Sequence, residues 1–197
     1  MPREAHEITH ADIMDMGEYA KVRNEKRKAM TAAKKDRRLH IGPDATAYFE
    51  NFDTMWHQIH EMLHIEQGGE AQIEDELSAY NPLIPYGREL VCTLMFEIDD
   101  PDRRAKFLNG LGGVEETVTL EFGSEVIKAV PEDDVDRTNA DGKASSIQFL
   151  HFPFTDAQAT QFKAAKESAV LSIGHEKYGH MAKLSPAVHE ALAADLD

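Results

Sequence analysis

The segment HQIHEMLHIEQ, residues 57–67, has the residue types and spacing of a metal site. Its central part, HEMLH, matches the H-E-x-x-H pattern, in which two histidines one helical turn apart bind zinc and the glutamate acts as general base. A third histidine stands one turn earlier. The candidate ligands for zinc or iron are therefore His57, His60 and His64. The candidate catalytic base is Glu61.

A polar helix face is the other interpretation of this segment. An α-helix turns by about 100° per residue, which places the three histidines and Glu61 in one sector, opposite an apolar stripe that includes Trp56, Ile59 and Leu63. A zinc hydrolase also needs a third protein ligand and a cleft. The residues after His64, IEQGGE, supply no further histidine. We favour a solvated polar face, with a metal-dependent hydrolase as the alternative.

Composition excludes several classes of partner. The 197 residues carry a formal net charge of −15, which argues against nucleic acid and anionic membranes. No apolar run is long enough for a membrane span, and the first residues lack the apolar core of a signal peptide. The single cysteine, Cys92, stands within an apolar strand-like run and is expected to be buried. These features favour a cytoplasmic protein.

The positive charge is concentrated near the N-terminus. Residues 1–38 hold 10 Lys and Arg against 7 Asp and Glu, whereas residues 39–197 hold 11 against 29. Sparse apolar spacing over residues 11–36 predicts one long helix with a thin apolar stripe. Its basic residues form either a solvated face or a docking surface for the acidic body, a second copy or an acidic partner. We therefore divide the chain into a basic N-terminal helix, 1–37, and a single domain, 38–197.

Periodicity in the remaining chain predicts an α+β fold. Gly42-Pro43-Asp44 is typical of a turn between two short strands, and helices follow over residues 53–67 and 70–80. The continuous apolar run in RELVCTLMFEI, residues 88–98, predicts a strand covered on both faces. Alternating segments after residue 113 predict further strands. We expect a mostly antiparallel sheet of about five to seven strands, with helices packed on one face and a long N-terminal helix.

Several motifs, in order along the chain, resemble a bacterial family, domain of unknown function 3501. They are KKDRRLHIGP, YFENFDT, QIHEML, DELSAYNPLIPYGREL, DGKASSIQFLHF and GHEKY, and they span about residues 8–180. The resemblance implies a compact cytoplasmic protein without an established activity, with rubrerythrin-type and iron–sulfur proteins as companions in redox or peroxide stress. In that family, the helix that corresponds to residues 57–64 has a sequence similar to YQIQEMLR. This pattern contains Gln58 and Glu61 but none of the three histidines.

The resemblance also points to polar residues for a shared binding site: Glu50, Asn51, Gln58, Asn81, Arg88 and Tyr178. His175, at a predicted strand end, is a second candidate general base beside Glu61. Structural roles are the alternatives. Asn51 is a potential helix cap, Asn81 a turn residue, and Glu50 with Arg88 an ion pair.

Three functions fit these observations. The first is a non-enzymatic accessory or binding protein of a redox module, whose basic helix serves self-association or docking. The second is a metal-dependent enzyme that uses His60, Glu61 and His64. The third is a small-molecule-binding protein with a pocket between the helix 53–67 and the sheet, lined by Glu61, Arg88 and Tyr178. We favour the first.

Overall fold

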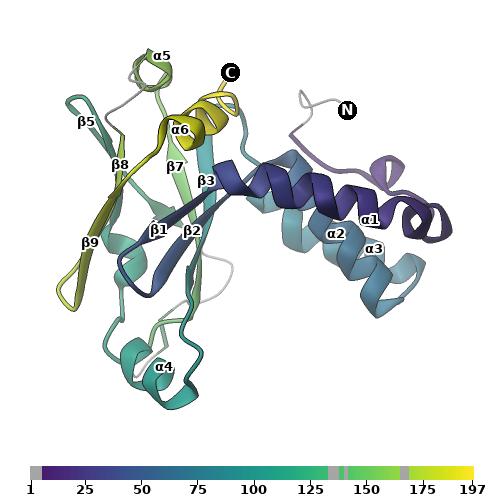
Figure 1. Cartoon of the computed structure of the whole chain (residues 1–197), viewed down its shortest axis with the longest axis horizontal. Helices are drawn as coiled ribbons and strands as arrows, with labels where there is room; N and C mark the ends of the chain where they lie inside the picture. Colours follow the sequence, from purple (N-terminus) through teal and green to yellow (C-terminus); the bar gives the residue numbers. More distant parts are fainter. Residues whose placement is uncertain (1–5, 133–137, 140–141, 165–168) are drawn as a thin grey trace.

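Two antiparallel sheets and a group of helices beside them make up the computed structural model, which describes residues 6–132, 138–139, 142–164 and 169–197 (Figure 1). The first sheet has the order β1 (Arg38–Ile41), β2 (Ala45–Glu50), β3 (Glu89–Phe96), β7 (Ile147–Pro153) and β6 (Val130–Pro131). The second has the order β5 (Glu125–Lys128), β4 (Val118–Phe122), β8 (Val170–His175) and β9 (Tyr178–Lys183). The α+β class and the antiparallel pairing are confirmed, and the strands are divided between two sheets.

The helical layer lies at one side of the sheets, where α1 (Met16–Ala33), α2 (Phe52–Glu66) and α3 (Glu70–Tyr80) run side by side (Figure 1). Short 3₁₀ turns flank these helices: η2 (His10–Asp12), η3 (Lys34–Arg37) and η4 (Asn81–Leu83). The long N-terminal helix predicted over residues 11–36 is present, although its α-helical part begins at Met16. Around the sheets lie the remaining elements: α4 (Pro101–Leu108), η5 (Val114–Thr117), α5 (Asp156–Ala164) and α6 (Pro186–Ala193).

Strand β3 separates two hydrophobic cores. Leu90, Cys92 and Leu94 point into the core between the two sheets, whereas Val91 packs into a second core beneath the helices. Both faces of β3 are therefore covered, which explains the continuous apolar run in its sequence. The second core includes Tyr19 of α1, so the N-terminal segment packs against α2 and the outer face of the first sheet.

Local signals fix the ends of α2. The side chain of Asn51 accepts a hydrogen bond from the Thr54 amide at 3.0 Å, and the Thr54 hydroxyl accepts one from the Asn51 amide at 2.9 Å. This reciprocal cap satisfies amides that have no partner inside the helix. At the other end, Gln67 has a φ of 54° and Gly69 a φ of 72°, which turns the chain into α3. In the part of the chain that the structure describes, no helix is both long and apolar enough to cross a membrane.

Candidate functional site

Helix α1 covers the face of α2 that carries the histidines. His60 is 0% exposed, and the Glu61 side chain is 13% exposed. The prediction of a solvated polar face is therefore wrong at these two positions. The angular positions of the side chains on α2 agree with the helical wheel, but a second helix, whose only buried residue is Tyr19, lies over this sector. The apolar stripe of α1 is so thin that the sequence gave no indication of which face of α2 this helix would cover.

His60 is held by two main-chain groups. Its Nε2 accepts a hydrogen bond from the Met14 amide at 3.0 Å, so the proton must be on Nδ1, which donates to the Trp56 carbonyl at 2.7 Å. Burial lowers the pKa of His60 to about 4, against the opposing effect of the Trp56 carbonyl. A metal ion would need the lone pair that Met14 already uses. His60 is thus a neutral structural residue that ties the segment before α1 to α2.

Glu61 is an anchor for α1. Arg23 donates to both of its carboxylate oxygens, each at 2.9 Å, and the Tyr19 hydroxyl donates to Oε1 at 2.9 Å. The hydrogen bonds from Arg23 lower the pKa of Glu61 to about 2 although burial opposes this, and Tyr19 adds to the effect. A general base works best with a pKa near the operating pH. Glu61 is instead ionised at neutral pH and serves as a partner of α1.

The other two histidines lie on either side of this ion pair. His57 is half-buried near the end of α1, and burial lowers its pKa. His64 lies beside the Tyr19 ring, with 6.1 Å between the ring centres. Among the described residues, no three His, Cys, Asp or Glu side chains are grouped so that they could hold a metal ion. The structure therefore does not combine His57, His60 and His64 into a zinc or iron site.

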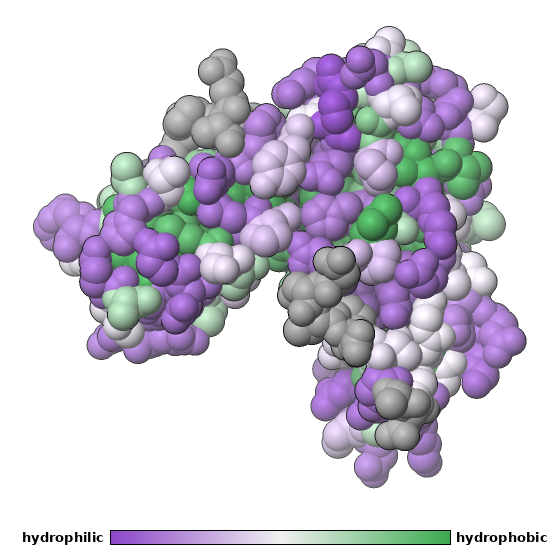
Figure 2. Space-filling model, turned by 180° about the vertical axis from the view of Figure 1, so that it is seen from behind, coloured by the Kyte–Doolittle hydropathy of each residue, from purple (hydrophilic) through white to green (hydrophobic). Residues whose placement is uncertain are grey.

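A cavity of about 510 Å³ opens where the start of α1, the end of α2 and the start of α3 meet. Five apolar side chains line it: Ile13, Met14, Met16, Leu63 and Ile73. Four polar ones share the wall: Asp15, His64, Gln67 and Glu70. We call this space the helical cavity. On the rear view of the molecule, apolar atoms are in sight among hydrophilic ones on the helical lobe, at the left of Figure 2.

The sequence did not lead us to predict the turn before α1, which forms one wall of this cavity. Residues 11–15 were predicted to be helical, but α1 begins only after Asp15, whose side chain accepts hydrogen bonds from the Gly17 and Glu18 amides. An Asp followed three residues later by Glu is a recognised signal for a helix start. That signal, in DMGE, could have located the turn.

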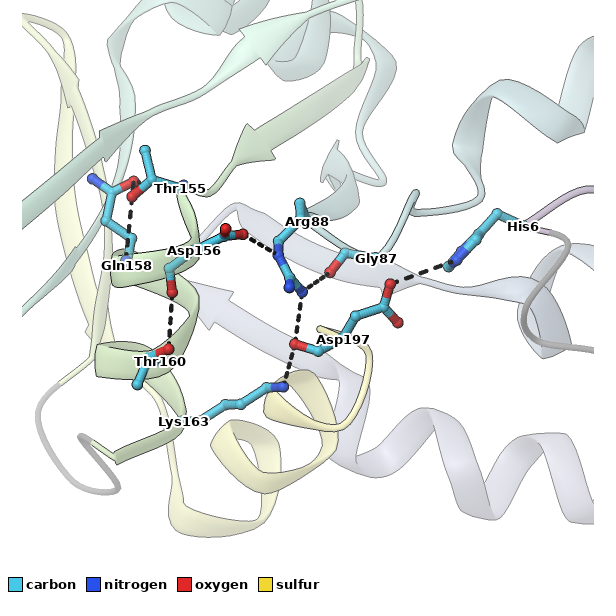
Figure 3. Close-up of polar contacts among 9 residues, drawn as sticks. All are labelled: His6, Gly87, Arg88, Thr155, Asp156, Gln158, Thr160, Lys163 and Asp197. Carbon is cyan, nitrogen blue, oxygen red and sulfur yellow. Dashed lines mark hydrogen bonds and ion pairs between the residues drawn. The ribbon is translucent and has the colours of Figure 1, made fainter.

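Arg88 organises a different region (Figure 3). Its Nε donates to Asp156 Oδ1 at 2.7 Å, and its Nη1 donates to a main-chain oxygen of Asp197 at 2.7 Å. Lys163 donates to the same oxygen at 2.5 Å, and the Asp197 amide donates to the Gly87 carbonyl at 2.8 Å. Arg88 therefore links α5 and the segment after α6 to the start of β3.

The expected ion pair between Glu50 and Arg88 does not form. Glu50 accepts hydrogen bonds from the hydroxyls of Thr54, at 2.7 Å, and Thr93, at 2.9 Å. Glu50 thus joins β2 and β3 to the first turn of α2. It lies in a different set of contacts from Arg88, whose carboxylate partner is Asp156.

Three other predicted binding residues have structural partners in separate places. Asn51 caps α2, as its alternative reading proposed. Asn81 forms two hydrogen bonds of 2.9 Å with the main chain of Ile8, and so fastens the N-terminal segment to η4. Gln58 lies near the Tyr80 hydroxyl, whose pKa burial raises and Gln58 lowers, so it belongs to the contact between α2 and α3.

Tyr178 and His175 lie at the β8–β9 turn, on the other sheet. The Tyr178 hydroxyl is buried, where it donates to the Ile41 carbonyl at 2.7 Å and accepts from the amides of Asp44 and Ala45 at 3.0 Å. His175 accepts from a main-chain amide two residues further on. Since Glu61, Arg88 and Tyr178 belong to three separate sets of contacts, the pocket expected from them does not form.

The comparisons with known proteins agree with this fold. Residues 7–196 match the sequence pattern of a family described as "Protein of unknown function (DUF3501)". A crystal structure described as a novel protein of unknown function from Burkholderia pseudomallei K96243 is 35% identical, with a TM-score of 0.89, over 96% of this chain and 99% of that one. No curated protein matches. The molecule is thus an α+β protein of two sheets and a helical layer, and the chain belongs to the DUF3501 family.

Proposed function

We propose that this protein is a binding protein rather than an enzyme, and that the helical cavity is its ligand site. The observation that carries this proposal is the cavity itself, whose volume of about 510 Å³ lies in the range of small-molecule sites, roughly 300–1,000 Å³. Its wall combines an apolar surface with a few polar groups, as such sites do.

The occupied hydrogen bonds of the HEMLH segment support a non-catalytic role. His60 uses both ring nitrogens for the main chain, and Glu61 is an ionised partner of Arg23 and Tyr19. The most suggestive catalytic residues of the sequence therefore attach α1 to α2. In doing so they hold one wall of the helical cavity against the other.

The wall of the helical cavity favours an apolar ligand with a positive charge. Asp15 and Glu70 are among its lining residues, and no Lys or Arg is among those that the structure describes there. Asp15 caps α1 through Oδ1 alone, and Glu70 lies 3.3 Å from His10. An amine attached to an apolar body would be accepted by the second oxygen of Asp15 and would compete with His10 for Glu70, whereas a carboxylate would find no such partner. Met14 and Met16 are unbranched and flexible, so this wall can adapt to the shape of a ligand.

Displacement of a fluorescent dye tests this proposal. We expect Nile red to bind and decylamine to displace it, while decanoate, of the same chain length, displaces it at least about tenfold less well. Met16→Trp should fill the cavity and abolish dye binding. Met181→Trp is the matched control, because Met181 is 74% exposed on β9. Dye binding that is absent, or equal in Met16→Trp and the wild type, would overturn the proposal.

Docking of an acidic partner or of a second copy is a second candidate function. It is favoured by α1, where Lys21 and Lys28 are exposed, as is Lys26 beside the Trp56 ring, in a chain of net charge −15. The family resemblance makes rubrerythrin-like and iron–sulfur proteins the first partners to test. Lys28→Glu should weaken such an association, and Lys183→Glu on β9 should not. Light scattering that gives the same mass for both variants and the wild type, alone and with these partners, would count against docking.

A further inference from the structure

A second cavity, of about 270 Å³, lies at the other end of the α1–α2 contact. It is bounded by the last turns of α1, η3, the start of β1 and the first half of α2. Four of its lining residues are cations: Arg27, Lys34, Lys35 and Arg38. No carboxylate is among the described residues that line it, although the chain as a whole has a net charge of −15. The negative end of the α1 dipole accounts for one or two cations here, but not for four around one space.

The two arginines of this cavity are only weakly engaged by acidic groups. Arg23 takes both oxygens of Glu61, so Arg27 lies 3.9 Å from that carboxylate and its side chain is 55% exposed. The guanidinium of Arg38 lies over the Tyr48 ring, 5.0 Å from its centre. A guanidinium stacked in this way keeps its N–H edge directed outward for an anion.

His57 contributes a polar atom without a partner. It lines the same cavity, and its Nε2 is buried with no hydrogen-bond partner among the residues that the structure describes. A buried polar atom in this state costs free energy, which a bound ligand would recover if the imidazole turned toward the cavity. The cavity therefore combines four positive side chains with an imidazole that can donate a hydrogen bond to an oxyanion when Nε2 carries a proton.

We propose that this cavity, which we call the cationic cavity, binds the phosphate group of a small phosphorylated compound. Arg27 and Arg38 can each present two N–H groups to phosphate oxygens, and Lys34 and Lys35 add charge. Met30 and Thr31 also line the space and would contact the rest of the compound. A neighbouring hollow of about 430 Å³ shares Arg27 and Thr31 and leaves room for a larger body.

The site does not depend on the function proposed for the helical cavity. The two cavities share no lining residue. The cationic cavity could thus fail to bind phosphate while the helical cavity binds its ligand. Equally, the helical cavity could fail while the cationic cavity binds phosphate.

Protonation of His57 should strengthen binding as the pH falls, whereas the phosphate group itself loses charge over the same range. Burial lowers the pKa of His57; Glu61 on its own helix opposes this, and Lys34 of η3 with Arg27 and Arg23 of α1 add to it. The imidazole is therefore neutral in the empty cavity at pH values above its usual pKa of 6.5. A phosphate anion would favour the protonated form, which donates a hydrogen bond, so binding takes up a proton.

Calorimetry with inorganic phosphate and glycerol 3-phosphate, at low ionic strength, tests the proposal. We expect both to bind. Between pH 8 and pH 6 the wild type should gain about tenfold in affinity relative to His57→Gln, a comparison that removes the effect of protonating the phosphate group itself. Lys34→Gln and Arg38→Gln should each weaken binding by about tenfold. Lys183→Gln, a change of the same charge on β9, should have no effect. In His57→Gln only the dependence on pH that comes from the phosphate's own second ionisation should remain.

Three results would overturn the proposal. The first is a folded wild-type protein that binds neither compound. The second is a loss of affinity in Lys183→Gln as large as that in Arg38→Gln, which would show a general effect of net charge. The third is binding of a polyglutamate peptide without binding of phosphate, which would assign this surface to an acidic protein. Circular dichroism of each variant verifies that a lost affinity is not a lost fold.

Discussion

Arg23 and Glu61 form a two-point ion pair that fixes α1 across the middle of α2. Both N–H···O distances are 2.9 Å, and the Tyr19 hydroxyl completes the set from the same side. The pair lies between the two cavities, with His64 toward the helical cavity and His57 toward the cationic one. Both sites therefore depend on the packing that this pair maintains.

Glu61→Gln should destabilise the protein, because it leaves Arg23 with a neutral partner in a partly buried place. We expect a loss of about 1–3 kcal/mol in the free energy of unfolding near neutral pH, measured with urea. Glu18→Gln is the matched control, because Glu18 forms an exposed ion pair with Lys21 within α1. This variant should change the free energy of unfolding little. Equal stability of the two variants would contradict the anchoring role.

The ion pair should also make stability depend on acid. The pKa of Glu61 is lowered from 4.5 to about 2, so its contribution is present above about pH 4.5 and is lost as the pH falls toward 2. The difference between the wild type and Glu61→Gln should therefore shrink over this range. A difference that stays constant down to about pH 2.5 would argue against the ionised contact.

His60 should give a second dependence on pH, at higher values. Its pKa is lowered from 6.5 to about 4, so the unfolded chain binds a proton before the folded one does. Stability is then complete above about pH 6.5 and falls as the pH drops toward 4. Urea unfolding of His60→Gln, which cannot titrate, should lack this part of the profile. His180→Gln, an exposed position on β9, should keep it.

Zinc should not stabilise the folded chain. A metal at a hundredfold excess over its Kd would add about 2.7 kcal/mol of stability and raise the melting temperature. We expect no such rise with zinc or ferrous iron, because Nε2 of His60 is occupied by the Met14 amide. Melting curves with and without chelator measure this. A stoichiometric metal that His60→Ala removes would contradict the account and restore the hydrolase hypothesis.

Arg88→Gln should loosen the segment after α6 without unfolding the sheets. Its contacts with Asp156 and Asp197 are its links to α5 and to that segment. Hydrogen exchange at the Asp197 amide, which donates to the Gly87 carbonyl, should become faster. Arg104→Gln, which loses only a bond to the Ile98 carbonyl, should leave this amide unchanged. Equal exchange in both variants would refute the link.

Local signals in the sequence were sufficient for most of the fold. The Asn51 cap and the doubly covered strand β3 were predicted from residue types alone, and so was the turn at Gly42. The division of the strands into two sheets was not, because pairing depends on contacts between segments distant in sequence. Strand β4 pairs with β8 some 50 residues away, and no local pattern specifies that choice.

The site was harder to predict for the same reason. The wheel placed Glu61 and His60 correctly on one face of α2, but burial of that face depends on Arg23 and Tyr19 of another helix. Likewise, Lys34 and Arg38 were recognised as basic, and only the packed structure brings them to His57. Residue types were sufficient to identify the polar groups of the site, whereas the partner of each group depends on contacts between distant segments.

The most direct test of the central claim is an amide NMR titration of the wild-type chain with decylamine. The account predicts shifts at the amides of Met14, Gly17 and Gln67, which line the helical cavity, and none at Gly174 on β8. Decanoate should leave all four in place. Decylamine that shifts none of the cavity amides, or shifts Gly174 as strongly, would contradict a ligand site in the helical layer.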